Sequence, residues 1–233
     1  MNAAELTGRA DTHVVDLGDG RPRLHREVVA PFQAMRAAAR GAGIDLAIAS
    51  AFRDFDRQRE LWNAKYRGER PALDAAGRPV DIARLDPAAR VGTILLWTAL
   101  PGGSRHHWGT DLDVYDRAAV PDGYRLGLVT AEYAPAGPFA ALTAWLDRHM
   151  RRFGFYRPYA TGVGGVRPEP WHLSFAPLAE PARRRLSVAL LAEALRGRGV
   201  LGEEAILAAL PGIHARYLWA VDRPPRMRSR WAR

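Results

Sequence analysis

The chain has 233 residues, of which 48% are apolar, carries no cysteine, and has a formal net charge of +9. This length and apolar content allow a sizeable buried core, and the lack of cysteine excludes disulfides and cysteine nucleophiles. No apolar run reaches the about 18 residues of a membrane span, and the first residues lack a secretory signal pattern. We therefore expect a cytoplasmic protein, with the periplasm or cell envelope as the alternative.

The basic charge raises the question of a nucleic-acid partner. Of the 34 basic residues only Lys65 is a lysine, and alanine, glycine and proline are also abundant. This preference for arginine over lysine is more typical of a GC-rich genome than of a nucleic-acid-binding surface. The basic residues are also dispersed along the chain. We therefore predict no nucleic-acid partner and interpret the arginine-rich segment 223–233 as a solvated tail.

The first strong periodicities predict a helix followed by a buried strand. Apolar residues recur at helical spacing in the first of them, at Val28, Phe32, Met35 and Ala39. Gly41 and Gly43 end this helix, and the apolar run 44–51 predicts a strand that delivers Arg53 to its end.

The next segments are a helix, an insertion and a second helix. Asp54 is placed to cap a helix through Trp62 and Tyr66, with Gln58 one turn inside it. The segment 71–84 is rich in turn residues and shows no periodicity. A further helix is predicted from apolar spacing that ends before a proline and two glycines, at Val91, Ile94, Leu95 and Thr98.

Two short segments carry the residues with the most chemical content. The first, 104–113, reads Ser-Arg-His-His-Trp-Gly-Thr-Asp-Leu-Asp, and the second, 169–172, reads Glu-Pro-Trp-His. Two histidines and one aspartate form the ligand set of a catalytic zinc site that leaves the fourth position to water. A glutamate three residues before the second histidine is placed to act on that water as a general base. A zinc hydrolase is the leading interpretation.

Alternation within these segments predicts two short strands. In the stretch 110–115, Asp111 and Asp113 share one face, and in the stretch 171–175, His172 shares a face with Ser174.

Neighbouring strands would bring His106, Asp113 and His172 to one metal, with Glu169 at the rim. Periodicity alone leaves His107 open as an alternative to His106, and Asp111 as an alternative to Asp113. The other histidines are expected to be ordinary hydrogen-bonded residues, as His107 is on balance: His13, His25, His149 and His214.

The remaining chain is predicted to be mostly helical. An amphipathic stripe suited to core packing is formed by Phe139, Leu142, Leu146 and Met150. The glycine-rich segment 161–165 predicts a flexible loop at the rim of the site, since it lacks the lysine of a phosphate-binding loop. After Pro177 the pattern is helical to about Trp219.

The two motifs resemble those of the zinc D-alanyl-D-alanine carboxypeptidases of the VanY/VanX type, the M15 peptidases. That family carries Ser-x-His-x-x-Gly-x-x-x-Asp followed by Glu-x-x-His. The matching residues are Ser104, His106, Gly109, Asp113, Glu169 and His172. A Ser-x-Phe-Arg segment at 50–53, with Gln58 behind it, and Phe-Gly-Phe at 153–155 also fit. Asp111 is a departure, because the family more often has a small residue there.

The resemblance implies a role for each matching residue. His106, Asp113 and His172 would bind one Zn²⁺ per chain, Glu169 would be the catalytic base, and Arg53 would polarise or anchor the substrate. Gln58 and Ser104 are, with Arg53, the candidates for binding the substrate carboxylate. Asp111 would either support a histidine ligand or alter substrate choice.

We therefore expect an α+β fold in which a small antiparallel sheet carries the zinc site, as in Hedgehog and D,D-peptidases. The predicted division is an N-terminal arm at 1–24, a peptidase core at 25–177, a helical extension at 178–222 and the basic tail at 223–233.

The expected function is hydrolysis of D-amino-acid bonds in peptidoglycan peptides, foremost as a D-Ala-D-Ala carboxypeptidase. L,D-carboxypeptidase and endopeptidase activities stay open, as does a non-catalytic zinc module that binds cell-wall peptide. The expected partners are peptidoglycan-derived peptides, and the oligomeric state is left open.

Overall fold

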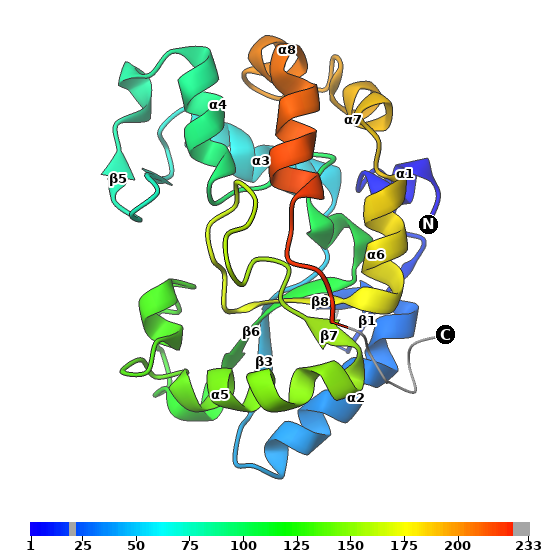
Figure 1. Cartoon of the computed structure of the whole chain (residues 1–233), viewed down its shortest axis with the longest axis vertical. Coiled ribbons are helices and arrows are strands. Elements are labelled where there is room, and N and C mark those ends of the chain that lie inside the picture. Colours follow the sequence, from blue (N-terminus) through cyan, green and yellow to red (C-terminus); the bar gives the residue numbers. More distant parts are fainter. Residues whose placement is uncertain (19–21, 226–233) are drawn as a thin grey trace.

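The computed structural model describes residues 1–18 and 22–225 (Figure 1), so most of the predicted basic tail lies outside the described residues. The helices are α1 (Ala3–Leu6), α2 (Arg26–Arg40), α3 (Phe55–Tyr66), α4 (Pro87–Leu95), α5 (Ala140–His149), α6 (Ala176–Arg185), α7 (Val188–Leu195) and α8 (Glu203–Ile213). The strands are β1 (Val14–Asp16), β2 (Arg23–His25), β3 (Leu46–Ser50), β4 (Ala72–Leu73), β5 (Pro79–Val80), β6 (Asp111–Asp116), β7 (Phe155–Tyr156) and β8 (His172–Phe175).

Shorter helical turns join these elements. Turns of 3-10 helix occupy Ile82–Arg84, Arg105–Trp108, Arg117–Ala119, Thr130–Tyr133 and Met150–Phe153. A π-helical turn over His214–Trp219 continues α8.

A four-stranded sheet lies at the centre, with strand order β3-β6-β8-β7 and antiparallel pairing throughout. The strands β1 and β2 form a separate antiparallel pair, and so do β4 and β5. The predicted α+β class with a small antiparallel sheet is confirmed. The β4–β5 pair lies in the segment 71–84, whose two-residue strands are too short to leave a periodic signal in the sequence.

One face of the sheet is apolar and packs on α2 and α5, which lie side by side across it in Figure 1. Alternate residues of β6 and β8 supply this face, namely Leu112, Val114, Leu173 and Phe175. The predicted stripe is also buried here: Phe139, Leu142, Leu146 and Met150. The opposite face of the same two strands is left for polar side chains, as the alternation predicts.

A second core lies on the other side, where α3 and α4 pack with the C-terminal helices α7 and α8 (Figure 1). Trp62 is fully buried there, and its indole N–H donates to the carbonyl of Leu201 at 3.0 Å. Leu6 of α1 joins the same core. The C-terminal helices are therefore packed on α3, the helix that carries Gln58. The predicted division at residues 24, 177 and 222 stays a prediction.

The helix predicted after Arg53 is present, and Asp54 caps it by accepting a hydrogen bond from the Arg57 amide at 2.7 Å. Gln58 lies in the first turn of this helix, as expected. None of the helices in the described part of the chain is both long and apolar enough to cross a membrane.

The turn that carries the first motif is held closely against the β1–β2 pair. Gly109 has φ +64°, in the left-handed region that favours glycine, and its carbonyl accepts a hydrogen bond from the His25 amide at 2.8 Å. A methyl group on Gly109 would lie 2.6 Å from both the His25 nitrogen and Val14 Cγ1. The motif glycine therefore serves both backbone geometry and close packing.

We expect Gly109→Ala to destabilise the protein more than Gly43→Ala. Gly43 has φ +78° but no atom within 4 Å of an added methyl group, so its substitution reports the backbone cost alone. That cost is about 1–2 kcal/mol, and the steric clash at Gly109 should add about 1–3 kcal/mol. Urea unfolding of both variants measures the difference, and equal losses would contradict the close-packing role of Gly109.

Candidate metal centre and substrate cavity

Three side chains from three elements converge above the polar face of the sheet. His106 comes from the turn Arg105–Trp108, Asp113 from β6 and His172 from β8, and one ligand atom from each lies within 4.8 Å of the others. His106 Nε2 is 3.5 Å from Asp113 Oδ2, and His172 Nδ1 is 3.2 Å from Asp113 Oδ1. Asp113 faces His172 directly across the β6–β8 ladder. We call His106, Asp113 and His172 the metal group, because together they could hold a metal ion. The register of the sheet thus positions two of its three residues.

The environment of His106 leaves one ring nitrogen free. His106 Nδ1 lies 2.9 Å from the carbonyl oxygen of Ala51, which can only accept a hydrogen bond, so Nδ1 is the donor. Nε2 then presents its lone pair toward Asp113. Burial, with a further contribution from Arg53, lowers the pKa of His106 to about 3. The ring is therefore neutral, which is the form that binds metals.

His172 is surrounded by carboxylates. Its Nε2 is 2.9 Å from Asp111 Oδ1, and its Nδ1 is 3.3 Å from Glu169 Oε2. Burial alone would lower the pKa of His172, but Asp111, Asp113 and Glu169 raise it well above its usual value. In addition, Asp113 Oδ1 is buried and forms no hydrogen bond within the described residues. A neutral histidine, an unsatisfied carboxylate and surplus negative charge fit a divalent metal with nitrogen and oxygen ligands.

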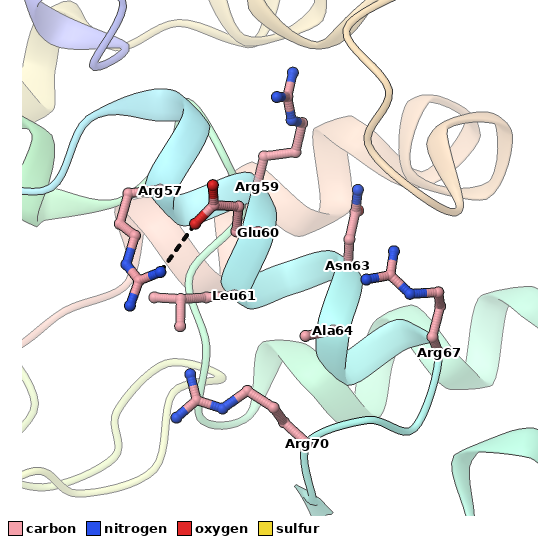
Figure 2. A pocket seen from close by; sticks show the side chains of 8 residues that line it. All are labelled: Arg57, Arg59, Glu60, Leu61, Asn63, Ala64, Arg67 and Arg70. Atoms are coloured by element: carbon pink, nitrogen blue, oxygen red, sulfur yellow. Dashed lines mark hydrogen bonds and ion pairs between the residues drawn. The ribbon is translucent and has the colours of Figure 1, made fainter.

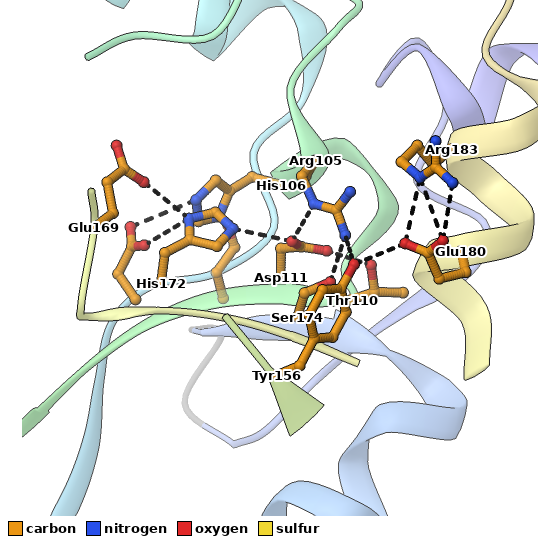
Figure 3. Close-up of polar contacts among 12 residues, drawn as sticks. Arg105, His106, Thr110, Asp111, Tyr156, Glu169, His172, Ser174, Glu180 and Arg183 are labelled. Carbon is orange, nitrogen blue, oxygen red and sulfur yellow. Dashed lines mark hydrogen bonds and ion pairs between the residues drawn. The ribbon is translucent and has the colours of Figure 1, made fainter. Parts of the chain in front are cut away.

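Asp111 lies behind His172 rather than in the metal group (Figure 3). It is 0% exposed, and it accepts hydrogen bonds from Arg105 Nε at 2.7 Å and from Thr110 Oγ1 at 2.6 Å. Although burial opposes ionisation, the charge of Arg105 holds the pKa of Asp111 well below its usual range. Asp111 is therefore an ionised partner for the His172 N–H, which directs Nδ1 to the metal position.

A chain of buried polar groups continues from Arg105 to α6 (Figure 3). Arg105 Nη2 donates to Ser174 Oγ at 2.6 Å and to the Tyr156 hydroxyl at 3.1 Å. The Tyr156 hydroxyl in turn donates to Glu180 Oε1 at 2.8 Å, and Arg183 pairs with the same glutamate at 3.0 Å. Arg105 carries no signal in the sequence, because it is one arginine among many.

His107, the alternative to His106, forms hydrogen bonds with two backbone segments. Its Nδ1 lies 2.6 Å from the carbonyl of Arg53, and its Nε2 accepts a hydrogen bond from the Gly102 amide at 3.1 Å. It therefore links two loops, and both of its ring nitrogens are engaged outside the metal group. Two other histidines also bond to backbone carbonyls, His13 to that of His107 and His214 to that of Leu186.

Glu169 and Arg53 lie beside the metal group without belonging to it. The Glu169 side chain is 14% exposed, and burial raises the pKa of its carboxyl above the usual value. Arg53 Nε is buried and has no hydrogen-bond partner in the described part of the chain. Burial lowers the pKa of Arg53, while the nearby charges of Asp113 and Glu169 oppose that change. Both side chains therefore face the same small space.

A cavity of about 430 Å³ opens over these groups. The predicted substrate-binding residues Gln58 and Ser104 line it together with Arg53. Gln58 Nε2 donates to the carbonyl of Ala99 at 2.7 Å, which leaves Gln58 Oε1 buried and unpaired, and Ser104 Oγ is also buried and unpaired. Three buried polar atoms at this wall thus have no hydrogen-bond partner among the described residues, which is unusual for buried polar groups.

Tyr159 is a cavity residue that the sequence analysis missed. Its ring meets the His172 ring edge to face at 5.0 Å between centroids, and its carbonyl accepts a hydrogen bond from the Glu169 amide at 2.9 Å. Tyr159 thereby helps to place both residues. The tyrosine stands in a run of aromatic and basic residues before Glu169 that has no distinguishing pattern.

The glycine-rich segment 161–165, which is predicted to be a flexible rim loop, contacts the C-terminal segment. Asp222 accepts hydrogen bonds from the Ala160 and Thr161 amides at 2.9 Å each, and the Gly165 amide donates to the carbonyl of Arg216 at 2.8 Å. The glycines permit close packing under the C-terminal segment. The loop that leads to Glu169 is therefore held by the end of the chain.

We expect Asp111→Asn to destabilise the metal-free protein by about 3–5 kcal/mol, because it leaves the buried charge of Arg105 without its partner. Combining it with Arg105→Met should recover at least about 1 kcal/mol relative to the sum of the single losses. Thr110→Val is the control, since it removes a hydrogen bond to Asp111 but no charge, at about 1 kcal/mol. Urea unfolding with a chelator present measures all four variants, and simple additivity would refute the pairing.

The sequence is similar to one family model and to several known proteins. A family model described as VanY, D-alanyl-D-alanine carboxypeptidase, matches residues 21–178. An uncharacterized protein of Haemophilus influenzae is 35% identical over 121 residues, which is 51% of this chain and 92% of that protein. A D-alanyl-D-alanine carboxypeptidase of Enterococcus faecalis is 26% identical over 173 residues, 73% of this chain and 54% of that protein.

Solved structures share the fold. VanYB in complex with D-alanine-D-alanine matches with a TM-score of 0.53 and 25% identity, over 82% of this chain and 91% of that one. A glutamate-to-alanine variant of the vancomycin resistance D,D-pentapeptidase VanY, in complex with Zn(II), matches with a TM-score of 0.52 and 24% identity, over 84% of this chain and 90% of that one.

The range matched by the family model contains the whole metal group, Glu169 and all three unpaired cavity residues. The chain belongs to the VanY family of D-alanyl-D-alanine carboxypeptidases.

Proposed function

We propose that this protein is a zinc-dependent D,D-carboxypeptidase that removes the terminal D-alanine from peptidoglycan peptides. The observation that carries the proposal is a metal group with a partly buried glutamate beside it, at a cavity whose lining includes three unpaired polar atoms. VanYB has been solved with D-alanine-D-alanine and a VanY variant with Zn(II), which supports the same ligands here.

We further propose that one zinc ion binds through His106 Nε2, the Asp113 carboxylate and His172 Nδ1. When bound, zinc polarises a carbonyl oxygen and makes a water molecule more acidic. Ala51 and Asp111 hold the two histidine rings by their other nitrogens, so that both lone pairs face the same point.

Glu169 is the proposed proton carrier of the reaction. Its carboxylate removes a proton from the attacking water as the new C–O bond forms, and it returns that proton to the leaving nitrogen as the C–N bond breaks. The products are the shortened peptide, with a new C-terminal carboxylate, and free D-alanine. The raised pKa of Glu169 suits both steps, because it brings the carboxyl closer to neutral pH than an exposed glutamate.

Arg53, Gln58 and Ser104 are proposed to bind the substrate. The unpaired Gln58 Oε1, Ser104 Oγ and Arg53 Nε supply both donors and acceptors at one wall of the cavity. Arg53 serves either the C-terminal carboxylate or the carbonyl oxygen that becomes charged during attack, since a guanidinium forms parallel hydrogen bonds with either group.

L,D-carboxypeptidase and endopeptidase activities use the same chemistry and differ only in the residues on either side of the broken bond. A purely non-catalytic peptide-binding module would have no need of Glu169. Its position beside His172 therefore favours an enzyme.

We expect His106→Ala, Asp113→Ala and His172→Ala each to lose most of the bound zinc, because each removes one of three ligands. His107→Ala is the matched control: it changes the adjacent histidine, whose ring nitrogens are both engaged outside the metal group, and should retain about one zinc per chain. Metal analysis after dialysis measures the content. Full zinc in the His106 variant, or its loss from the His107 variant alone, would contradict the assignment.

We expect the zinc-loaded protein to release one D-alanine from a pentapeptide that ends in D-Ala-D-Ala. Glu169→Ala should retain its zinc yet lose at least about 100-fold in turnover, the scale for a general base. Mass spectrometry of the products measures both.

Two further substrates separate the alternatives in the same assay. A tetrapeptide reports L,D-carboxypeptidase activity, and a cross-linked dimer reports endopeptidase activity. Cleavage of either in place of the pentapeptide would replace the proposed specificity, and full activity of Glu169→Ala would remove that residue from the mechanism.

A further inference from the structure

The wall of the cavity formed by α3 carries cations that the proposed reaction does not use. Lys65 and Arg70 line the cavity together with Arg53, while Glu169 is the one acidic residue that lines it among the described residues. The salt bridges found in residues 1–18 and 22–225 include none to Lys65, Arg70 or Arg53. This wall therefore carries more positive than negative charge, and its three cations form no salt bridge among the described residues.

Lys65 is the most unusual of these cations. It is the only lysine in the chain, and its ammonium donates to Thr98 Oγ1 at 2.6 Å. Burial, followed by repulsion from Arg70, lowers the pKa of Lys65 to about 8. A partly buried ammonium with one neutral hydrogen-bond partner and no salt bridge among the described residues has donors to spare, although the charge of Glu169 partly offsets the lowering of its pKa.

Arg70 extends the positive wall to the outside. It lines the cavity and also an adjacent hollow of about 450 Å³ on the outer side of α3. Figure 2 shows its side chain running back along α3 toward Leu61, while Arg59 and Arg67 project elsewhere. Arg70 and Lys65 therefore approach the cavity from the same end of α3.

The spacing along α3 relates Lys65 to the proposed carboxylate wall. Gln58 and Lys65 are seven residues apart on one helix, so both lie on the same face, with Leu61 between them. Seven residues of α-helix correspond to about 10 Å, and an extended peptide covers about 3.3–3.6 Å per residue. A peptide whose C-terminal carboxylate accepts hydrogen bonds from Arg53 and Ser104, beside Gln58, would thus bring its third residue from the end near Lys65.

We propose that Lys65 and Arg70 form a second carboxylate-binding site, which selects substrates with an acidic group on the third residue from the C-terminus. This inference rests on the proposed carboxypeptidase function and names the substrate class for it. The competing explanation is that Lys65 only ties α3 to Thr98 beyond the end of α4, in which case its charge would not influence substrate choice.

Two N-acetylated tripeptides test the site, one with L-glutamate and one with L-glutamine before D-Ala-D-Ala. They differ only in one carboxylate. Release of D-alanine gives KM for each, and the wild-type protein should show a KM about 10-fold lower for the acidic peptide, the usual scale for hydrogen bonds to charged groups. Lys65→Met should bring the ratio of the two KM values close to one, and Lys65→Arg should restore most of it.

Arg67→Met is the matched control, because it removes a cation two residues along the chain that does not line the cavity. Its KM ratio should equal that of the wild type. Should Lys65→Met not fold, Arg70→Met tests the same site and should also reduce the ratio. A wild-type ratio near one, or a ratio unchanged in Lys65→Met, would overturn the proposal.

A binding measurement tests the second carboxylate site independently of the proposed reaction. Calorimetric titration of both peptides into the Glu169→Ala protein measures the affinity ratio without cleavage. If the wild-type enzyme cleaves neither peptide, the carboxypeptidase function is wrong, and the affinity ratio still decides the carboxylate site. If both peptides are cleaved with equal KM, the function stands and the second site does not exist.

Discussion

The pairing of β6 with β8 is the constraint on which the rest of the site depends. It sets Asp113 opposite His172 and Asp111 opposite Ser174, while the intervening leucines enter the apolar core. Because successive side chains of a strand alternate between faces, a slip of one residue would exchange the two sets. Packing of the core against α2 and α5 therefore also stabilises the register that assembles the metal group. Stability and site geometry have the same origin here.

Several carboxylates lie on the polar face of the sheet, and an arginine neutralises only the one behind His172. Arg105 neutralises Asp111 behind His172, and hydrogen bonds carry this contact through Tyr156 to Glu180 in α6. Asp113 and Glu169 form no salt bridge with an arginine or lysine among the described residues, and Glu169 lines the cavity. Arg105 thus neutralises the carboxylate behind His172, whereas the charge of Arg53 acts on Asp113 and Glu169 without a salt bridge among the described residues, which leaves room for a metal cation. Glu180 of α6 contributes to this arrangement from just beyond the range matched by the family model.

Much of the site could be predicted from the sequence, because short-range patterns determine it. Alternation within β6 places Asp111 and Asp113 on one face, and the motif spacing distinguishes His106 from His107 once the family resemblance is included. The remaining contributors depend on long-range packing. Arg105 contacts Tyr156 from 51 positions away, and Lys65 contacts Thr98 from 33 positions away. The hydrogen bond between Thr161 and Asp222 could not be predicted either, because no short-range sequence pattern relates residues so far apart in the chain.

The central claim is that the hydrogen-bond partners behind the two histidines determine which of their nitrogens bind zinc. Crystallography of the zinc-loaded protein, with anomalous data collected at the zinc absorption edge, tests it directly. The account predicts a single anomalous peak contacted by His106 Nε2, the Asp113 carboxylate and His172 Nδ1, with Asp111 still on His172 Nε2. A peak contacted by Asp111, or by the opposite nitrogen of either histidine, would contradict it.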